Sequence, residues 1–298
     1  MAVTAIGRPD EPGQVPGSST RKRRRCIKPG SLIVLALLLL FAFLTLLPLY
    51  WMVVSSLKPQ SEIFSLTTTW VPKTPTLKNY TGLFQATNFG RWLFNSIFVT
   101  GLSTVLGILL ASMAGFAFAK YEFRGKQALF WIALGSVSIP QIVTIIPIFN
   151  WFSRMGLTDT YFVLAVPPAI NVFAVFLLRQ YISGLPDEML ESARIDGITE
   201  WGLYWRIVLP LVRPGMGAAA IFLWVGTWSA YLWPLIMVQS NQMFTLPLGL
   251  ATMYANPWDL DYGRLMAGAV VSTLPITVAF LIMQEQFIAG LTQGAVKG

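Results

Sequence analysis

The sequence predicts an all-α integral membrane protein with six transmembrane helices, and three observations support this fold class. Hydrophobic residues make up 55% of the 298 residues and charged residues only 11%, whereas nearly a quarter of an average soluble domain is charged. Six segments of roughly 18 or more residues lack Asp, Glu, Lys and Arg, as a helix surrounded by lipid requires. Alternation of apolar and polar residues with period 2 is absent, which excludes a transmembrane β-barrel.

The predicted spans differ in their internal features. The first is longer than the core of a signal peptide and no small-residue cleavage site follows it, so we expect a retained helix. Prolines at positions 140, 147, 167 and 168 predict kinks in the third and fourth spans. Aromatic residues typical of the membrane interface lie toward span ends, at Trp51, Trp92, Trp131, Trp151, Tyr161 and Trp233. The six spans are Leu32–Val54, Ile97–Ala119, Ala128–Phe149, Tyr161–Leu178, Met216–Val238 and Met266–Gln284.

The composition also excludes several classes of function. The chain has no His, which removes the commonest acid–base group and the commonest metal ligand. Its single cysteine, Cys26, excludes an internal disulfide and a cysteine-based metal site. The net charge of +8 could indicate nucleic-acid binding, but in so apolar a chain basic loops that face the cytoplasm explain it better.

The basic residues predict that both termini are cytoplasmic. With this orientation 15 of the 21 Lys and Arg residues lie on the inner side, as the positive-inside rule requires. The outer loops hold the other six, which are Lys58, Lys73, Lys78, Arg91, Arg154 and Arg264. Residues 1–30 combine Gly, Pro and Ser with a basic block, so we expect a disordered cytoplasmic tail near anionic lipid. Residues 31–298 then form one six-helix domain.

The loop of residues 186–214, between the fourth and fifth spans, is more than a simple connector. Pro186 suits a helix start, and the segment from Glu188 to Ile195 predicts about two helical turns. Asp196-Gly197 predicts a turn that ends this helix, and Thr199 can cap a second one. Small residues at the tip would let another protein approach closely. The residues alone leave two alternatives open, a docking element and an ordinary surface loop folded onto the bundle.

The same loop resembles the "EAA" loop of permease subunits in binding-protein-dependent ABC importers. It differs from that motif by Ser192 at the second position and by Ile198 where the carbohydrate branch often has Ala. The resemblance covers nearly the whole chain from residue 31, and the C-terminal tail is similar to that of the maltose-type second permease subunit. The matching residues are Glu191-Ser192-Ala193, Asp196-Gly197, Ile207-Val208-Leu209-Pro210, Asn79-Tyr80, Asn95-Ser96, Trp228, Trp233-Pro234-Leu235 and Gly290 to Gly298.

This resemblance implies a type I ABC importer permease fold in the plasma membrane and a division of labour among subunits. The implied partners are a second permease subunit, a cytoplasmic ATPase dimer that binds ATP and Mg²⁺, and an extracytoplasmic solute-binding protein. The chain itself would bind no cofactor and catalyse no reaction, and it has no GxxxxGK[ST] loop. The resemblance implies that the ATPase contacts Glu191, Ser192, Ala193, Asp196 and Gly197, and that a second contact lies at Gly294, Lys297 and Gly298.

Polar residues inside the spans are candidates for a substrate path, because a polar group in lipid is costly unless it pairs or lines a cavity. Trp224 and Trp228, four residues apart, could stack on a sugar ring, although packing and interhelical hydrogen bonding explain such residues equally well. The other candidates are Ser136, Ser138, Gln141, Thr144, Asn171, Thr227, Ser229 and Tyr231.

The lack of charge in the spans favours a neutral mono- or oligosaccharide over glycerol 3-phosphate. An ion-coupled carrier or a membrane enzyme is a further alternative, but the spans have neither the carboxylates nor the nucleophilic and basic groups that these need.

The predicted orientation can be tested with Cys26, the only thiol in the chain. A membrane-impermeant maleimide should label Cys26 in inside-out vesicles and leave it unlabelled in intact cells, because the tail is expected on the cytoplasmic side. Labelling from outside the cell would invert the orientation.

Overall fold

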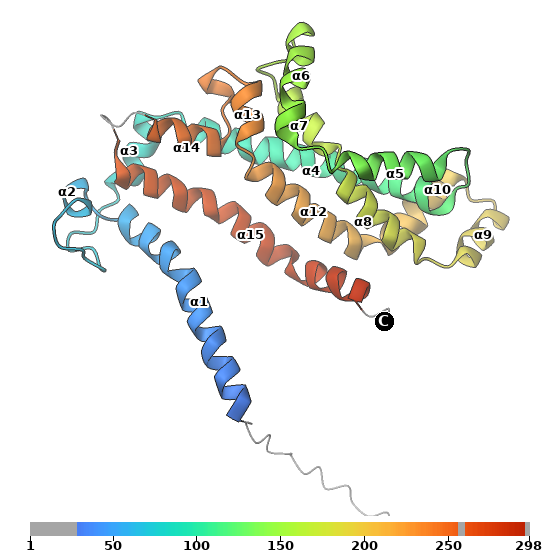
Figure 1. Ribbon diagram of the computed structural model, residues 1–298, viewed down its shortest axis with the longest axis horizontal. Coiled ribbons are helices and arrows are strands. Elements are labelled where there is room, and N and C mark those ends of the chain that lie inside the picture. Colours follow the sequence, from blue (N-terminus) through green and yellow to red (C-terminus); the bar gives the residue numbers. More distant parts are fainter. Residues whose placement is uncertain (1–28, 256–259, 296–298) are drawn as a thin grey trace, which may run out of the picture. The chain divides into compact units, whose positions relative to one another are not determined.

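The computed structural model describes residues 29–255 and 260–295 (Figure 1), and all regular structure in these ranges is helical. Residues 1–28 of the predicted tail, among them Cys26, lie outside these ranges. The chain divides into two compact units between Pro48 and Leu49. The boundary falls inside α1 (Pro29–Ser56), whose leucine-rich N-terminal part is exposed along its length, as lipid-facing side chains would be.

Three segments are long and apolar enough to cross a membrane as single helices. They belong to α1, to α4 (Phe89–Lys120) and to α15 (Tyr262–Ala295). Three pairs of bent helices pass the same test when each pair is taken together, so up to six crossings are present. The first, second and sixth predicted spans therefore correspond to single helices.

The third predicted span, Ala128–Phe149, is wrong as a continuous helix. It is divided into α5 (Lys126–Ser136) and α6 (Gln141–Arg154), whose axes meet at 101°. Pro140 precedes α6 and adopts an extended conformation. Proline lacks an N–H and disfavours helical geometry in the residue before it, which favours the break at this point.

The fourth and fifth predicted spans are also interrupted. The fourth consists of α7 (Tyr161–Ala169) and α8 (Val172–Ser183), which meet at 40° around Asn171. The fifth, predicted as Met216–Val238, covers α12 (Arg213–Trp228) and the short α13 (Leu232–Met237), whereas the bent pair that passes the test joins Glu200–Leu211 to α12 at 78°. Hydropathy cannot reveal these breaks, because the residues on both sides are equally apolar.

The second unit is organised around α4, which contacts α3 (Lys78–Ala86), α7, α8, α12 and α14 (Leu246–Tyr254). Small residues recur along its buried face, at Ser96, Ser103, Gly107, Ala111 and Gly115. A Cβ atom on Gly115 would lie 3.0 Å from the backbone nitrogen of Arg179 in α8. Such small faces let helix backbones approach closely where no hydrophobic effect drives helices together.

Two buried asparagines, one in α3 and one in α4, hold irregular segments of the second unit. The Asn79 amide donates to the carbonyl oxygens of Ser56 and Lys58, at 2.7 and 2.8 Å. The Asn95 amide donates to the carbonyl oxygens of Gln242 and Phe244, beside the 3₁₀ turn η2 (Asn241–Met243). These bonds satisfy carbonyl groups of irregular segments, which lipid could not do.

The close approach of α4 to α8 predicts opposite effects for two glycines of the same helix. Gly115→Ala should lower the free energy of unfolding by about 1–3 kcal/mol, because the added Cβ pushes against the backbone of α8. Gly101→Ala should leave stability unchanged or raise it by up to about 1 kcal/mol, since its Cβ would meet no atom within 4 Å. Thermal unfolding in detergent measures both. Equal shifts in the two variants would contradict the close approach.

Candidate transport cavity and coupling loop

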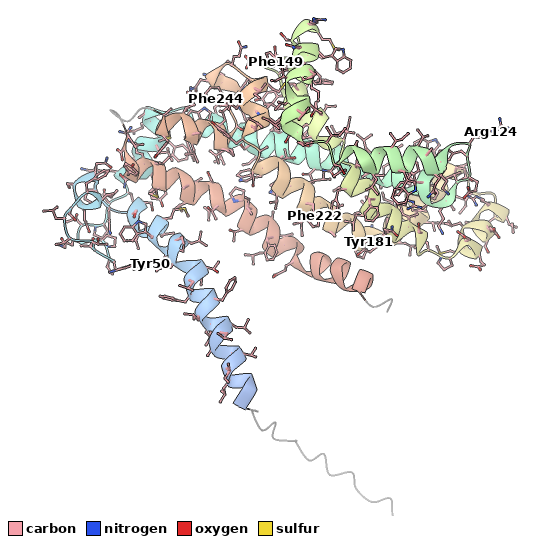
Figure 2. All side chains as sticks on the ribbon, viewed as in Figure 1. Tyr50, Arg124, Phe149, Tyr181, Phe222 and Phe244 are labelled. Carbon is pink, nitrogen blue, oxygen red and sulfur yellow. The ribbon has the colours of Figure 1, made fainter. Side chains whose placement is uncertain are left out.

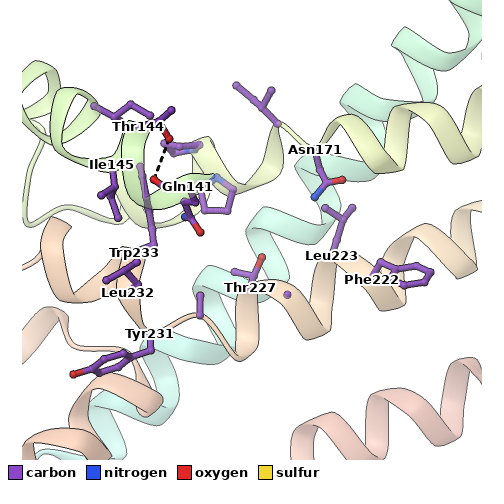
Figure 3. A pocket seen from close by; sticks show the side chains of 16 residues that line it. Gln141, Thr144, Ile145, Asn171, Phe222, Leu223, Thr227, Tyr231, Leu232 and Trp233 are labelled. Atoms are coloured by element: carbon purple, nitrogen blue, oxygen red, sulfur yellow. Dashed lines mark hydrogen bonds between the residues drawn. The ribbon is translucent and has the colours of Figure 1, made fainter. Parts of the chain in front are cut away.

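A cavity of about 540 Å³ lies where α6, the α7–α8 break, the end of α12 and the start of α13 meet (Figure 3). Its volume is within the range of sites for small organic ligands. The polar residues that line it are Gln141, Thr144, Asn171, Thr227 and Tyr231. The structure thus brings together five of the ten substrate-path candidates named from the sequence, and Ser136, Ser138, Ser229, Trp224 and Trp228 do not line this cavity.

These polar groups differ in how far the fold already uses them. Asn171 is the N-cap of α8, and its side-chain oxygen accepts from the backbone N–H of Ala174 at 2.9 Å. The Thr227 hydroxyl lies 3.4 Å from that of Ser103 in α4. Among the described residues, the Gln141 amide and the Tyr231 hydroxyl have no hydrogen-bond partner. Gln141 and Tyr231 therefore have the greatest capacity to bind a solute.

Trp224 and Trp228 share a face of α12, as expected, but this face is not the cavity wall. Their rings stack with centroids 6.3 Å apart and planes 6° from parallel. The Trp228 indole donates to the carbonyl oxygen of Ser272 in α15 at 3.2 Å, and its side chain is buried in a core cluster. The two tryptophans thus pack α12 against α15, and they are not among the residues that line the cavity.

Two aromatic residues complete the wall of the cavity. Neither was predicted from the sequence to line the substrate path. Phe222 contacts Phe173 edge to face at 5.0 Å. The Trp233 indole donates to the carbonyl oxygen of Val163 at 2.9 Å, which fixes α13 against α7. Hydropathy gave no signal for either role, because both residues lie in an apolar run.

A carboxylate in the loop before α7 holds the segment after α13. Asp159 accepts from Ser240 Oγ at 3.0 Å and from the backbone N–H groups of Gln239 and Ser240, both at 3.1 Å. Burial raises the pKa of Asp159, but the three donors outweigh burial and hold this pKa below its ordinary value. Asp159 has a φ of 59°, a conformation that Asp tolerates better than most residues.

At the opposite end of α8 and α12, the 186–214 loop forms the local structure that the sequence predicts. The helix α9 (Asp187–Ile195) ends at Gly197, whose φ is 81°. The backbone N–H of Gly197 donates to the carbonyl oxygen of Arg194 at 3.0 Å, and that of Ile198 to Ala193 at 3.1 Å. This pair of bonds is a Schellman motif, which requires a left-handed residue at the position of Gly197. Thr199 caps α10 (Glu200–Leu203), and its hydroxyl accepts from Gly202 N–H at 3.2 Å.

The residues that the resemblance assigns to the ATPase contact lie on two faces of α9. Glu191, Ser192, Asp196 and Gly197 are exposed, whereas Ala193 is buried in a cluster with Leu190, Leu203, Tyr204 and Val208. Ile195 is 86% exposed at the end of α9. The exposed surface around Gly197 continues into a groove of about 580 Å³ bordered by Trp201 and Trp205.

Polar contacts connect this loop to the end of α4. Lys120 Nζ lies 2.6 Å from the Asp187 carboxylate, and it also donates to the carbonyl oxygen of Leu185. Glu200 pairs with Arg194 at 2.9 Å and accepts from the Tyr121 hydroxyl. Deeper in the loop, the Tyr204 hydroxyl lies 2.6 Å from that of Ser112 in α4, where both residues are buried. Tyr204 begins a π-helical turn, η1 (Tyr204–Val208), which precedes α11 (Leu209–Leu211).

Of the second expected ATPase contact, the structure describes only one residue. Gly294 falls within the range of α15, whereas Lys297 and Gly298 lie outside the described residues.

Comparison with known proteins decides the family. Residues 103–293 match the family described as the binding-protein-dependent transport system inner membrane component. The chain belongs to this family. It is a multi-pass permease of the plasma membrane, and it falls in the carbohydrate-uptake branch that the sequence predicts.

The relatives of the permease in this branch cover most of its length. It is 39% identical over 260 residues to the arabinooligosaccharides transport system permease protein AraQ of Halalkalibacterium halodurans, a match that covers 86% of this chain and 93% of that protein. It is 34% identical to the trehalose transport system permease protein SugB of Mycobacterium tuberculosis, with coverage of 85% and 93%. It is 30% identical to the diacetylchitobiose uptake system permease protein NgcG of Streptomyces coelicolor, with coverage of 88% and 87%.

A solved structure confirms the fold class. A chain of a bacterial ABC transporter involved in the import of the acidic polysaccharide alginate superposes with a TM-score of 0.79 at 20% identity. The match covers 88% of the permease and 98% of that chain.

Proposed function

We propose that the permease carries a neutral mono- or oligosaccharide into the cytoplasm through the cavity beside Gln141 and Tyr231. The observation that carries this proposal is the chemistry of the cavity wall, which combines amide and hydroxyl groups with the aromatic faces of Phe222, Tyr231 and Trp233. Sugars offer hydroxyl groups to such polar side chains and apolar C–H faces to aromatic rings. The oligosaccharides and trehalose named for the relatives belong to the same chemical class.

The lack of charge argues against an ionic solute. Within the described residues that line the cavity there is no Asp, Glu, Lys or Arg. A phosphate or ammonium group taken from water into such a site would lose several kcal/mol of solvation without a countercharge. Glycerol 3-phosphate is therefore the less favoured substrate, and an ion-coupled mechanism lacks the intramembrane carboxylates that it needs.

We further propose that ATP hydrolysis on a separate ATPase dimer drives transport through α9. The exposed residues Glu191, Ser192, Asp196 and Gly197 would contact the ATPase, with Gly294, Lys297 and Gly298 as a second contact. This assignment is supported by the rigid Schellman turn at Gly197 and by the exposed Ile195, an apolar side chain that a partner could cover. A second permease subunit would close the cavity, and an extracytoplasmic binding protein would deliver the sugar. ATP and Mg²⁺ would bind only to the ATPase.

The proposed substrate class predicts the outcome of an uptake screen. The importer, reconstituted in vesicles with its binding protein, should show saturable uptake of neutral mono- or oligosaccharides and none of sugar phosphates or polyamines. Saturable uptake of a charged solute alone would refute the substrate class, while the assignment to the importer family would stand.

The cavity geometry refines this prediction to single residues. Gln141→Leu and Tyr231→Phe should each raise the KM for sugar uptake up to about tenfold, since each removes a hydrogen-bonding group worth about 1 kcal/mol. Neither change should lower the unfolding temperature, because the fold does not use these groups. Trp228→Phe is the matched control. It should lower stability through the lost bond to Ser272 and leave KM unchanged.

The coupling assignment can be tested at two glycines with the same backbone geometry. Gly197 and Gly125 both have a φ of 81°, and a Cβ on either would meet no atom within 4 Å. Leucine at either position should therefore cost a similar amount of stability, on the order of 1 kcal/mol. Gly197→Leu should abolish both uptake and sugar-stimulated ATP hydrolysis, whereas Gly125→Leu should preserve both.

The contrast between these variants separates docking from backbone strain. If Gly197→Leu assembles normally and transports at the rate of Gly125→Leu, the ATPase does not approach the turn at Gly197. Partial rescue by Gly197→Asn, which tolerates the left-handed conformation, would show how much of the loss comes from the backbone.

A further inference from the structure

The segment between α2 (Gln60–Ile63) and α3 exposes apolar side chains although it is held in a fixed conformation. We refer to residues 64–77 as the α2–α3 loop. Leu66 is fully exposed, Val71 is 68% exposed and Trp70 is 55% exposed. Exposed large apolar groups in such a cluster indicate a surface that is not designed to face water alone.

Hydrogen bonds hold this loop in a defined conformation, so its apolar side chains are exposed on a folded segment. Glu62 Oε1 accepts from Thr69 Oγ1 at 2.8 Å and from the Lys73 N–H at 2.9 Å. The Lys73 N–H, aided by the Thr69 hydroxyl, holds the pKa of Glu62 below its ordinary value, so the carboxylate remains an acceptor. The buried Lys58 ammonium donates to the carbonyl oxygen of Thr69. At the base of the loop, Thr76 N–H donates to the carbonyl oxygen of Leu57 at 2.8 Å.

The loop folds back along the last turns of the first membrane span. The Tyr50 hydroxyl donates to the carbonyl oxygen of Trp70 at 2.6 Å, and the rings of Trp51 and Trp70 meet edge to face at 5.7 Å. Lys58 Nζ lies 4.7 Å from the centre of the Trp51 ring. Figures 1 and 2 show this loop beside the end of α1 that carries Tyr50.

These contacts define the depth of the loop relative to the span. Tyr50 precedes the last residue of the span, Ser56, by six residues, which corresponds to about 9 Å along a helix axis. Tyr and Trp at such a position are typical of the boundary between lipid headgroups and acyl chains. Since Trp70 packs against both residues, the loop reaches the same level.

We propose that the α2–α3 loop is an interfacial membrane anchor that inserts Leu66, Trp70 and Val71 into the boundary between headgroups and acyl chains. Its occupant is lipid, because the apolar surface is continuous with the lipid-facing end of α1. Charge supports this choice. Lys73 and Lys78 are exposed, and Glu62 is the only acidic residue between positions 49 and 88, so this stretch has a net positive charge that complements any anionic headgroup it meets. Anchored in this way, the loop fixes the height and rotation of the first span relative to the membrane surface.

Depth-dependent fluorescence quenching tests the anchor in the assembled importer. In a Cys26→Ser background, Leu66→Cys and Val71→Cys are each labelled with bimane, with Ser61→Cys in α2 as an exposed polar control. The importers are reconstituted in nanodiscs of phosphatidylethanolamine and phosphatidylglycerol that contain a lipid with a nitroxide near its headgroup. Sugar-stimulated ATP hydrolysis confirms that each labelled complex is intact.

The labels at positions 66 and 71 should be quenched at least about threefold more than the label at position 61, as expected for side chains within the interface. Equal quenching at all three positions would overturn the anchor. The anchor would also be overturned if lipid nitroxides leave position 66 unquenched and the label becomes shielded from aqueous iodide only when the solute-binding protein is added. That result would assign the surface to protein docking.

Discussion

The close packing of α7, α8 and α12 on the small-residue face of α4 is the constraint on which the rest of the second unit depends. A Cβ on Gly107 would lie 2.9 Å from Leu223 in α12 and 3.1 Å from the carbonyl oxygen of Ala169 in α7. Lipid is as apolar as the helix surfaces, so helix association relies on dispersion contacts and interhelical hydrogen bonds. Both need short interaxial distances. The glycines of α4 therefore determine where α8 and α12 run.

These two helices connect the cavity to the coupling loop. Asn171 begins α8 at the cavity, and Thr227 lies near the cavity end of α12, while the 186–214 loop joins their opposite ends. The loop is attached to α4 by two kinds of contact. The pair of Lys120 with Asp187 has an exposed carboxylate and contributes little free energy. Tyr204 is buried and hydrogen-bonded to Ser112 of α4, so losing this contact would leave a buried hydroxyl unpaired. The buried residues therefore form the stronger attachment of the loop to α4.

Much of this arrangement could be predicted from the sequence, because local signals carry it. Apolar runs gave the positions of the spans, and the Asp196-Gly197 pair and Thr199 gave the end of one loop helix and the start of the next. Prolines predicted kinks in the third and fourth spans, but neither the 101° angle at Pro140 nor the break after Trp228 could be inferred, since hydropathy is the same on both sides of each break. The direction of the Trp224 and Trp228 face could not be inferred either. Two tryptophans four residues apart define a face, but only the position of α15 decides which neighbour covers it.

In the short motif Glu191-Ser192-Ala193, the two small residues have different surroundings. The side chains of Glu191, Ser192 and Ile195 face outward, whereas Leu190 and Ala193 pack against Leu203 and Tyr204 of the same chain. Ala193 is small because α9 lies close to its own bundle, where a larger side chain would displace the helix. Ser192 is exposed and its hydroxyl donates to the carbonyl oxygen of Glu188 at 2.8 Å, so no packing within this chain limits its size. Gly197 differs from both, because its φ of 81° restricts the position to glycine or a residue that tolerates the left-handed region. The motif thus combines an internal packing requirement at Ala193, a backbone requirement at Gly197 and an exposed surface around Ser192.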